Sequence, residues 1–446
     1  MSEKTQQKFP PGPAGSTYAI LFGERRQDGL AFFTKLAHDY GDVSQLRLLN
    51  FRTLFINHPD DIEDVLVNKA RSFEKGRVMK ANMRLFGDGL LTSEGDFWLR
   101  QRRLAQPAFH RARIAAYGAT MVEYAERTMR QWKSGETRDI HEDMMQITLQ
   151  IVGKTLFNAD LGRDAKEVGE TLEILLTLAA DFGKTILIPL WVPTPRNLRA
   201  RLGIRRIERI IYRIIAQKRA EARDTGDLLS MLLAVQDEDG SRMTDKQLRD
   251  ETITLFLAGH ETTANALSWT IWLLAQNLEV EKKFHAELDS VLAGRAPTVD
   301  DIPKLVYTGH VLTESMRLYP PAWGMARLVR EPVEVAGYKL EPGNGVACAQ
   351  WVVHRDSRWF DEPEEFRPER WGGDLAKRIP RFAYFPFGGG PRQCIGNSFA
   401  LMEATLILAT VAQKFRFNLV KEHPVKPLAS ITLRPAHGIR ATLEAR

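Results

Sequence analysis

Residues 385–396, FPFGGGPRQCIG, constrain the fold more than any other segment of this chain. One of only two cysteines follows three consecutive glycines here, and helical periodicity continues over residues 396–414. Two cysteines cannot form a disulfide framework, so we expect a protein of a reducing compartment. A thiolate at the start of a helix is stabilised by the helix dipole and by free backbone N–H groups. The segment therefore predicts a ligating or reactive thiolate at Cys394.

Five positions of this segment fit the frame F-x-x-G-x-R-x-C-x-G, namely Phe387, Gly390, Arg392, Cys394 and Gly396. The glycines let a flat ligand approach the backbone closely, and the arginine suits a carboxylate near the sulfur. Haem is a flat ligand that carries carboxylates, so it suits this segment with its iron on the sulfur and a propionate on the arginine. A buried cysteine in a glycine-rich turn is the alternative, and the five matched positions argue against it.

This frame is the haem-ligand signature of the cytochrome P-450 family, which the chain resembles over nearly its whole length. The resemblance implies one triangular haem-thiolate domain over 1–446, mainly α with a small β portion. It implies haem b as cofactor and Cys394 as the iron ligand. We expect an extended N-terminal arm over 1–15 and no fused reductase.

Hydrophobic periodicity agrees with a mostly helical chain. Strands are expected at 42–57, 334–340 and 345–351, forming a small antiparallel portion built from both ends of the chain. Helices are expected at 29–40, 60–69, 96–105, 114–132, 141–157, 165–182, 204–222, 227–236, 244–277, 298–319 and 396–414.

Trp98 and Arg102 form a W-x-x-x-R motif. At this spacing their N–H donors point the same way from a helix and suit a carboxylate. An amphipathic helix with one core tryptophan is the alternative. By resemblance, both residues contact a haem propionate, and Arg327 and Arg392 supply further propionate contacts.

Glu314 and Arg317 form an E-x-x-R motif, whose side chains share a helix face. Alone the motif carries little weight, because such pairs are common on protein surfaces. The segment FRPERW at 366–371 follows it. By resemblance, Arg370 joins the pair to lock the core behind the haem, which gives all three residues a structural role.

Residues 258–263, AGHETT, lie within the longest predicted helix. A glycine followed by hydroxyl residues disfavours regular helical hydrogen bonding and can open a local groove. An acid next to an alcohol can relay protons. By resemblance, Glu261 and Thr262 deliver protons to dioxygen, and Ala258 and Gly259 lie over the haem. A kinked packing helix is the alternative.

A thiolate together with an acid–alcohol pair predicts reductive activation of dioxygen, with one oxygen atom inserted into the substrate. Only 52 residues follow Cys394 and no G-x-G-x-x-G fingerprint occurs, so NAD(P)H acts indirectly, through a separate ferredoxin or flavodoxin with its reductase. The alternatives are a peroxide-using peroxygenase or isomerase, and a non-catalytic haem-binding gas sensor. The docking candidates are basic residues near the two motifs: Arg100, Arg103, Arg378, Arg381 and Arg392.

By resemblance, the segments through which a substrate enters are the stretch before Trp98, the middle helices with their loop, and the strand after the E-x-x-R helix. These segments are mostly apolar, which predicts a hydrophobic substrate such as a fatty acid, terpenoid or steroid-like molecule. The AGHETT, PERW and LYPP forms resemble the branch of fatty-acid and terpenoid hydroxylases. The candidate pocket residues are Met83, Phe86, Leu187, Leu255, Ala322 and Met325.

The net charge of +6 suits a basic patch that docks an acidic protein partner. Nucleic acid is not expected, because the chain shows no recognition motif. No apolar run approaches the roughly 18 residues that span a bilayer. We therefore expect a cytoplasmic monomer without a membrane anchor.

Overall fold

The computed structural model describes residues 9–13, 28–48, 51–77, 79–80, 86–159, 164–180, 191–221, 226–234 and 242–446. The chain folds into two compact units. The first comprises Met1–Arg77, Arg317–Glu365 and Gly373–Cys394. The second comprises Val78–Met316, Phe366–Gly372 and Ile395–Arg446. The predicted single domain stays a prediction.

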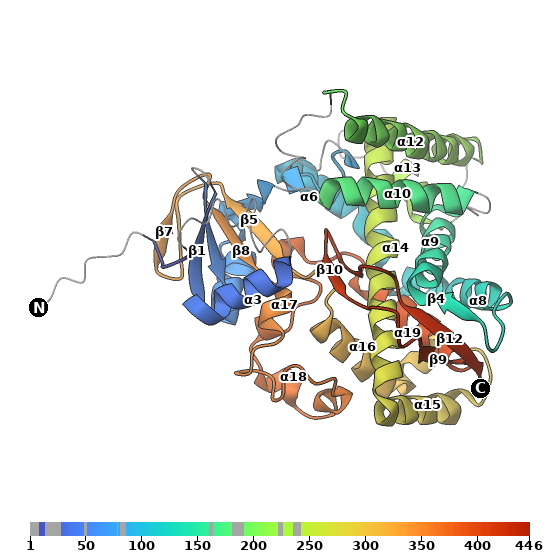
Figure 1. The fold of residues 1–446 in the computed structure, drawn as a ribbon. Coiled ribbons are helices and arrows are strands. Elements are labelled where there is room, and N and C mark those ends of the chain that lie inside the picture. The colour runs from blue at the N-terminus through green and yellow to red at the C-terminus, as the bar shows by residue number, and fades with distance from the viewer. Residues whose placement is uncertain are drawn as a thin grey trace, which may run out of the picture. The chain divides into compact units, whose positions relative to one another are not determined.

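The first unit is built around a five-stranded sheet of order β1-β2-β8-β5-β3 (Figure 1). The strands are β1 (Val43–Leu48), β2 (Phe51–Ile56), β3 (Phe73–Lys75), β5 (Met325–Val329) and β8 (Gly345–Cys348). All neighbours are antiparallel except β2 and β8, which are parallel. The expectation of a purely antiparallel portion was therefore wrong. A long connection separates β2 from β8 in the sequence, and parallel pairing requires such a crossover.

Both faces of this sheet are covered, because side chains alternate along β2. Phe55 packs with Phe33 and Leu36 of the helix α3 (Gly29–Tyr40). Leu54 and Ile56 point to the other face, into a core shared with α4 (Pro59–Glu63) and the π-helical turn η1 (Asp64–Asn68). The alternation of side chains along β2 thus determines which residues are buried on each face of the sheet.

Several predicted elements of the first unit differ in detail. The predicted strand at 334–340 is a hairpin of β6 (Val333–Val335) and β7 (Tyr338–Leu340), because Ala336 and Gly337 have the positive φ angles of a tight turn. The predicted strand at 345–351 ends at Cys348 and is followed by α17 (Gln350–Val353). The shorter pieces are η2 (Ala70–Ser72), α18 (Leu375–Arg378), η6 (Arg381–Ala383) and η7 (Gly390–Arg392).

The second unit is helical and is organised around the 32-residue helix α14 (Asp245–Gln276). Thr244 and Gln247 form a capping box at its start. Figure 1 shows α14 in yellow-green, with α9, α12 and α19 packed against it. The other helices are α6 (Gly95–Ala105), η3 (Gln106–Phe109), α7 (Arg111–Ala116), α8 (Gly118–Met129), α9 (Ile140–Phe157), α10 (Asp164–Ala180), α12 (Pro195–Glu221), α13 (Leu228–Ala234), α15 (Leu278–Leu292), η4 (Val299–Lys304), α16 (Val306–Leu318), η5 (Pro368–Gly372) and α19 (Asn397–Ala412).

The predicted helices agree with the observed bounds except at four places. The segment 60–69 divides into α4 and the π-helical turn η1. The segment 298–319 divides into η4 and α16, because Pro303 lacks the N–H that a longer α-helix needs. The segment 114–132 divides at Tyr117 into α7 and α8. The helix α12 begins at Pro195 rather than at residue 204, with proline in the first helical turn. The helix α15 was not predicted.

Two small sheets complete the second unit. The strands β4 (Thr137–Asp139), β12 (Arg440–Ala445) and β9 (Phe415–Leu419) form one antiparallel sheet. The strands β10 (Pro427–Ala429) and β11 (Leu433–Pro435) form a hairpin. Trp269 of α14 donates its indole N–H to Leu433 O at 3.0 Å, which fastens this hairpin to α14. In the described part of the chain, no helix is both long and apolar enough to cross a membrane.

Candidate functional site

The cysteine loop, residues 385–394 of the first unit, is fixed by its own backbone. Cys394 N donates to Phe387 O at 3.0 Å, and Gly388 N donates to Phe385 O at 2.9 Å. Gly388 and Gly390 have φ angles of 69° and 66°, which L side chains rarely adopt. A Cβ at Gly390 would also collide with the carbonyl oxygen of Leu66 in η1. The glycines are therefore required by the conformation and by the close approach of η1.

The base of the cysteine loop is held by buried aromatic residues. Phe385 N donates to Nε2 of the buried His354 at 3.0 Å. A Cβ at Gly389 would collide with the ring of Phe382, so the loop also lies tightly against that side chain. The loop thus rests on a packed core.

The two cysteines lie in opposite environments. Cys348 on β8 is buried, and burial raises the pKa of its thiol to about 12. Cys394 is exposed at the end of the cysteine loop, next to the half-buried Arg392. Of the two thiols, the exposed one is the one that a ligand can reach.

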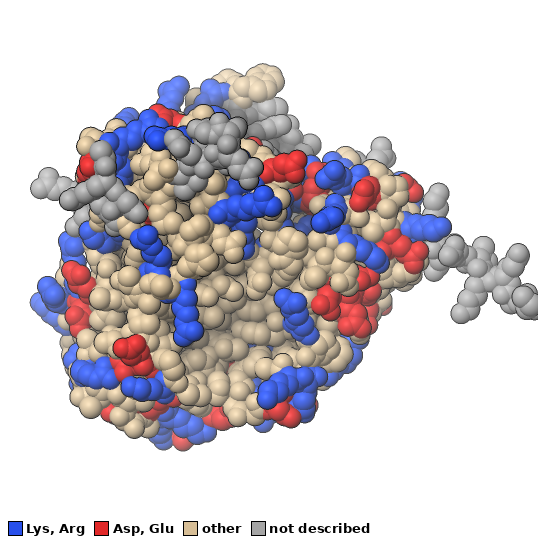
Figure 2. All heavy atoms as spheres, turned by 180° about the vertical axis from the view of Figure 1, so that it is seen from behind, with Lys and Arg blue, Asp and Glu red and all other residues tan. Residues whose placement is uncertain are grey.

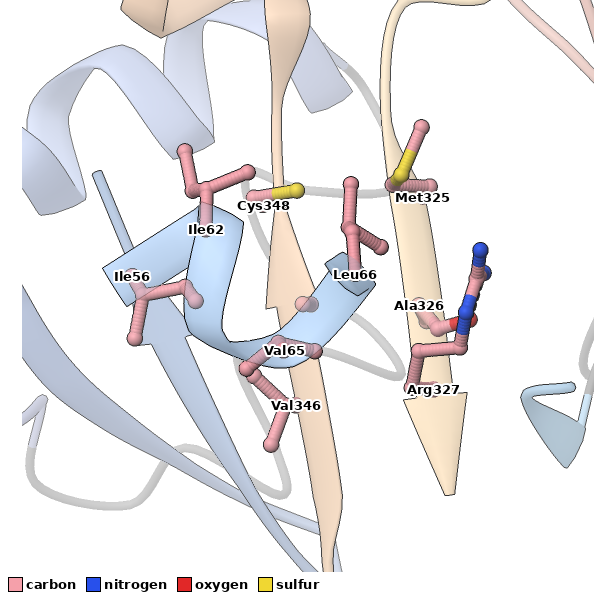
Figure 3. A pocket seen from close by; sticks show the side chains of 10 residues that line it. Ile56, Ile62, Val65, Leu66, Met325, Ala326, Arg327, Val346 and Cys348 are labelled. Atoms are coloured by element: carbon pink, nitrogen blue, oxygen red, sulfur yellow. Dashed lines mark hydrogen bonds between the residues drawn. The ribbon is translucent and has the colours of Figure 1, made fainter. Parts of the chain in front are cut away.

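A small apolar pocket of the first unit is lined by residues of β2, α4, η1, β5 and β8 (Figure 3). Met325 and Arg327 of β5 line it, and Figure 3 shows Arg327 at the edge away from Ile56. A Cβ at Gly388 would lie 3.5 Å from Met325 Cε, so Met325 contacts the loop side of this unit. Ala322 is half-buried in the segment before β5. The first unit therefore brings Met325 of β5 against the cysteine loop.

Glu261 and Thr262 of α14, in the second unit, bond to different partners. Glu261 is buried and accepts a hydrogen bond at Oε1 from Thr432 Oγ1 at 2.6 Å. Asn265 Nδ2 donates to the same Thr432 hydroxyl at 3.2 Å. Thr262 Oγ1 donates to Ala258 O at 2.8 Å. No hydrogen bond joins Glu261 to Thr262 among the described residues.

The environment of Glu261 favours its neutral form. Burial raises the pKa of its carboxyl, and the Thr432 hydroxyl opposes this as a smaller effect. Thr432 lies at the turn between β10 and β11, 171 residues along the chain from Glu261. No signal in the sequence links the two positions, so Thr432 was missed.

The helix α14 stays continuous through the AGHETT segment. Ala258 is exposed, and Thr262 is half-buried. A Cβ at Gly259 would lie 2.9 Å from Val152 Cγ2 of α9, so this glycine permits close helix packing. His260 is fully buried with Nδ1 against Phe256 O, and burial lowers its pKa to about 4. Gly259 and His260 therefore both take part in packing inside the second unit.

Trp98 and Arg102 lie on α6, as their spacing predicts. Trp98 is buried and Arg102 is half-buried. Gln101 between them is also buried, and within the described residues neither of its amide atoms has a hydrogen-bond partner. A buried amide without hydrogen bonds lowers the stability of the folded protein, and most buried amides in proteins have a partner. The sequence analysis missed Gln101.

The remaining predicted contacts lie in or beside helices of the second unit. Phe86 and Leu255 are buried, the latter on α14. Gly396 is the N-cap of α19 and adjoins the ring of Phe109. Met83 and Leu187 lie outside the described residues.

Glu314 lies at the centre of a buried cluster in the second unit. It accepts hydrogen bonds from Arg370 Nε at 2.8 Å, Trp371 Nε1 at 2.8 Å and Arg367 N at 3.1 Å. Arg317 is fully buried in the first unit and donates to the carbonyl oxygens of His354, Pro363 and Glu365. Both side chains thus tie the PERW region and the segment before it to α16.

The basic docking candidates differ in their surroundings. Arg378 pairs with Asp374 at 2.7 Å on the surface of the first unit, whereas Arg381 is exposed beside Phe382. On the face drawn in Figure 2, lysines and arginines are interspersed with acidic residues. Charge alone therefore does not single out one docking patch on that face.

The comparison with known protein families identifies this chain. The sequence pattern of the family "Cytochrome P450" matches residues 10–440, so the chain belongs to the cytochrome P450 family. Its fold class, mainly α with a smaller β portion, is confirmed. The protein is a haem-thiolate monooxygenase that acts on a hydrophobic molecule. It uses haem b, dioxygen and electrons that come from NAD(P)H through a reductase.

Three relatives are similar to this chain over most of their length. Cyclooctatin synthase of Streptomyces melanosporofaciens is 37% identical over 95% of this chain and 92% of its own length. Cyclooctat-9-en-7-ol 5-monooxygenase of the same organism is 38% identical over 85% of this chain and 83% of its own. Pentalenene oxygenase of Streptomyces avermitilis is 34% identical over 91% of each chain.

Proposed function

We propose that Cys394 is the thiolate ligand of the haem iron. The supporting observation is its exposed thiol at the end of a loop whose backbone lacks side chains at Gly388, Gly389 and Gly390. A flat, carboxylate-bearing ligand fits this donor set, since the half-buried Arg392 and Arg327 lie in the same unit. When bound, the haem supplies the redox chemistry that activates dioxygen.

The other haem contacts are proposed residue by residue. Arg327 and Arg392 in the first unit, and Trp98 and Arg102 in the second, donate to propionates through their N–H groups. Phe387, Gly396, Ala258 and Gly259 supply contacts without charge. Glu314, Arg317 and Arg370 are structural, which their buried hydrogen bonds support.

Glu261 and Thr262 are the proposed proton-delivering pair. The raised pKa of Glu261 keeps its carboxyl protonated closer to neutral pH, as a proton donor requires. Oε1 accepts the Thr432 hydroxyl, so we assign the proton to Oε2. Thr262 donates to Ala258 O, which leaves the lone pairs of its oxygen available to accept a proton.

The pair is tested with Thr262→Ala, compared with the conservative Thr262→Ser. The alanine variant is expected to bind haem and substrate normally but to divert reducing equivalents to hydrogen peroxide, with coupling reduced about tenfold or more. The ratio of product formed to NAD(P)H consumed measures this. Unchanged coupling in the alanine variant would contradict the relay.

Hydroxylation of a terpenoid is the proposed reaction. The similarity to the two cyclooctatin-related enzymes and to pentalenene oxygenase carries this proposal. The apolar side chains of Phe86, Leu255 and Met325 support a hydrophobic substrate. A panel of terpenes, fatty acids and steroids, followed by the spin shift of the haem on displacement of water, tests it. A spin shift with fatty acids alone would redirect the proposal to that class.

We also propose a cytoplasmic monomer that receives electrons from a separate ferredoxin or flavodoxin. Turnover with a ferredoxin and its reductase, compared with turnover on added peroxide, tests this electron route. Equal or faster turnover on peroxide would instead favour a peroxygenase.

A further inference from the structure

The loop at residues 86–93 of the second unit is bound to the first half of α14 by two neighbouring carboxylates. Leu90 N donates to Oε2 of Glu251 at 3.0 Å, and Asp88 N donates to Oδ2 of Asp250 at 3.0 Å. Both acidic residues are buried. Hydrogen bonds from backbone N–H groups to carboxylates are roughly twice as strong as those between neutral groups. We call residues 86–93 the α14-bound loop.

The backbone of the α14-bound loop lies directly on α14. A Cβ at Gly89 would collide with Thr254 Oγ1 and with the carbonyl oxygen of Asp250. A Cβ at Gly87 would collide with the carboxylate of Asp250, and Gly87 has a φ angle of 82°. Two glycines thus let the loop approach α14 closely enough for its N–H groups to reach the carboxylates.

The α14-bound loop also closes on itself. Thr92 Oγ1 donates to Gly87 O at 2.7 Å, and the backbone N–H groups of Thr92 and Ser93 donate to Gly89 O at 3.0 and 2.9 Å. These bonds join its two ends, so a contact at Leu90 also constrains its first residue. That residue is the buried Phe86, which belongs to the candidate pocket.

Glu251 lies on the same face of α14 as the residues proposed to act near the haem. Positions 251, 255, 258 and 262 follow the i, i+4, i+7 spacing of one helix face. This face carries Leu255 of the candidate pocket, the exposed Ala258 and the half-buried Thr262. The bond from Leu90 N to Glu251 therefore sets the position of the α14-bound loop along this face, one helical turn before Leu255.

Asp250 supports more than the loop. Lys246 Nζ donates to its carboxylate at 2.9 Å, and Arg249 pairs with it as well. Arg249 also pairs with Glu208 of α12 at 2.6 Å. A change at Asp250 would therefore disturb α12 too, which makes Glu251 the better residue for a test of the loop.

We propose that Glu251 is a positioning residue of the oxygenation site. By accepting from Leu90 N, it holds the α14-bound loop so that Phe86 and Leu90 form a wall for the bound molecule next to Leu255. This inference rests on the proposed haem site and extends it, because it assigns selection by molecular shape to a carboxylate that acts through the loop. Without Glu251, ligands large enough to reach the wall lose a contact, whereas small ligands do not.

The test compares two ligands of the haem iron that differ in size. Imidazole is small enough to bind the iron without this wall, whereas 4-phenylimidazole carries a ring that packs against it. Titrations followed by the Soret shift of the haem-loaded protein give both dissociation constants. Glu251→Ala is expected to weaken 4-phenylimidazole about tenfold and imidazole less than about twofold. Glu251→Gln keeps an acceptor oxygen and is expected to weaken 4-phenylimidazole only about threefold.

Hydrogen exchange reports on the α14-bound loop without any ligand. The Leu90 amide is expected to exchange about tenfold faster or more in Glu251→Ala, because its acceptor is removed. This measurement needs neither haem ligation nor turnover. A failure of the loop contact is therefore distinguishable from a failure of the proposed haem site, which would appear as absent azole binding in the wild type.

Glu287→Ala is the matched control. Glu287 of α15 accepts from Tyr307 N at 2.6 Å and from Thr308 N at 2.8 Å, so the variant also removes a carboxylate from backbone N–H groups of the second unit. It is expected to lower the melting temperature but to keep the ratio of the two azole dissociation constants and the exchange rate of Leu90. Circular dichroism establishes that every variant is folded.

Three outcomes would overturn the proposal. The Leu90 amide could exchange in Glu251→Ala as it does in the wild type. The two azoles could be weakened equally in Glu251→Ala. The control Glu287→Ala could change the ratio of the two dissociation constants as much as Glu251→Ala does.

Discussion

The cysteine loop of the first unit and the acid–alcohol segment of α14 in the second are held by different kinds of contact. The loop is held by short-range backbone hydrogen bonds and by glycines that η1 and Phe382 leave no room to replace. The acid of α14 is held by one hydroxyl, from Thr432 at the turn of a distant hairpin. A locally determined conformation leaves its pattern in neighbouring residues, whereas a long-range bond does not.

Gly390→Ala probes the loop and is expected to have the largest effect. A Cβ there meets the Leu66 carbonyl oxygen, and the φ angle of 66° disfavours alanine. The cost is expected to be about 3 kcal/mol of unfolding free energy, with loss of haem retention. Denaturant unfolding and haem content measure it. Gly373→Ala is the control, because Gly373 is exposed with no atom near its Cβ position; equal losses in both variants would break the comparison.

His260→Asn tests whether the buried histidine of α14 makes the stability of the protein depend on pH under acid conditions. Burial lowers the pKa of His260 to about 4, so the unfolded chain binds a proton before the folded protein does. Stability is therefore lost as pH falls from about 6.5 to about 4, by about 3 kcal/mol for this residue. The variant is expected to lose correspondingly less over that window in unfolding titrations. A His260→Asn profile parallel to that of the wild type would contradict the assignment.

Thr432→Val tests the long-range bond directly. It removes the donor to Glu261 Oε1 and is expected to cost about 1–2 kcal/mol. Without this donor the pKa of Glu261 rises further, so the folded variant retains its proton to higher pH than the folded wild type. The destabilisation should therefore increase as pH rises through the pKa of Glu261 in the folded wild type, which burial holds above the usual value of a glutamate. Thr432→Ser is expected to behave like the wild type. A loss of stability in Thr432→Val that does not change with pH would contradict the effect of Thr432 on the pKa of Glu261.

The same contrast explains which parts of the molecule could be read from the sequence. The strongly periodic α3, α9 and α14 were predicted to within one residue at each end. The short strands β3 and β5 were missed, because three to five residues carry too little periodicity and depend on partners far along the chain. The parallel pairing of β2 with β8 was missed for the same reason.

The candidate site follows this pattern too. The frame around Cys394 is contiguous, so Cys394 and its glycines could be singled out from the sequence, whereas the exposure of the thiol could not. The hydrogen bonds of Glu261 and Asn265 to Thr432 arise from tertiary packing, and Gln101 has no motif that marks it. Gly259, which stays a proposed haem contact, also has its Cβ position against Val152, a packing contact that no motif in the sequence marks.

The most direct test of the central claim is the Soret difference spectrum of the reduced protein with carbon monoxide, recorded for the wild type and for Cys394→His. The account predicts a strongly red-shifted band in the wild type, typical of a thiolate-ligated haem, and its loss in the variant. A histidine-like band in the wild type, or a red-shifted band that survives in Cys394→His, would contradict the assignment of Cys394 as the iron ligand.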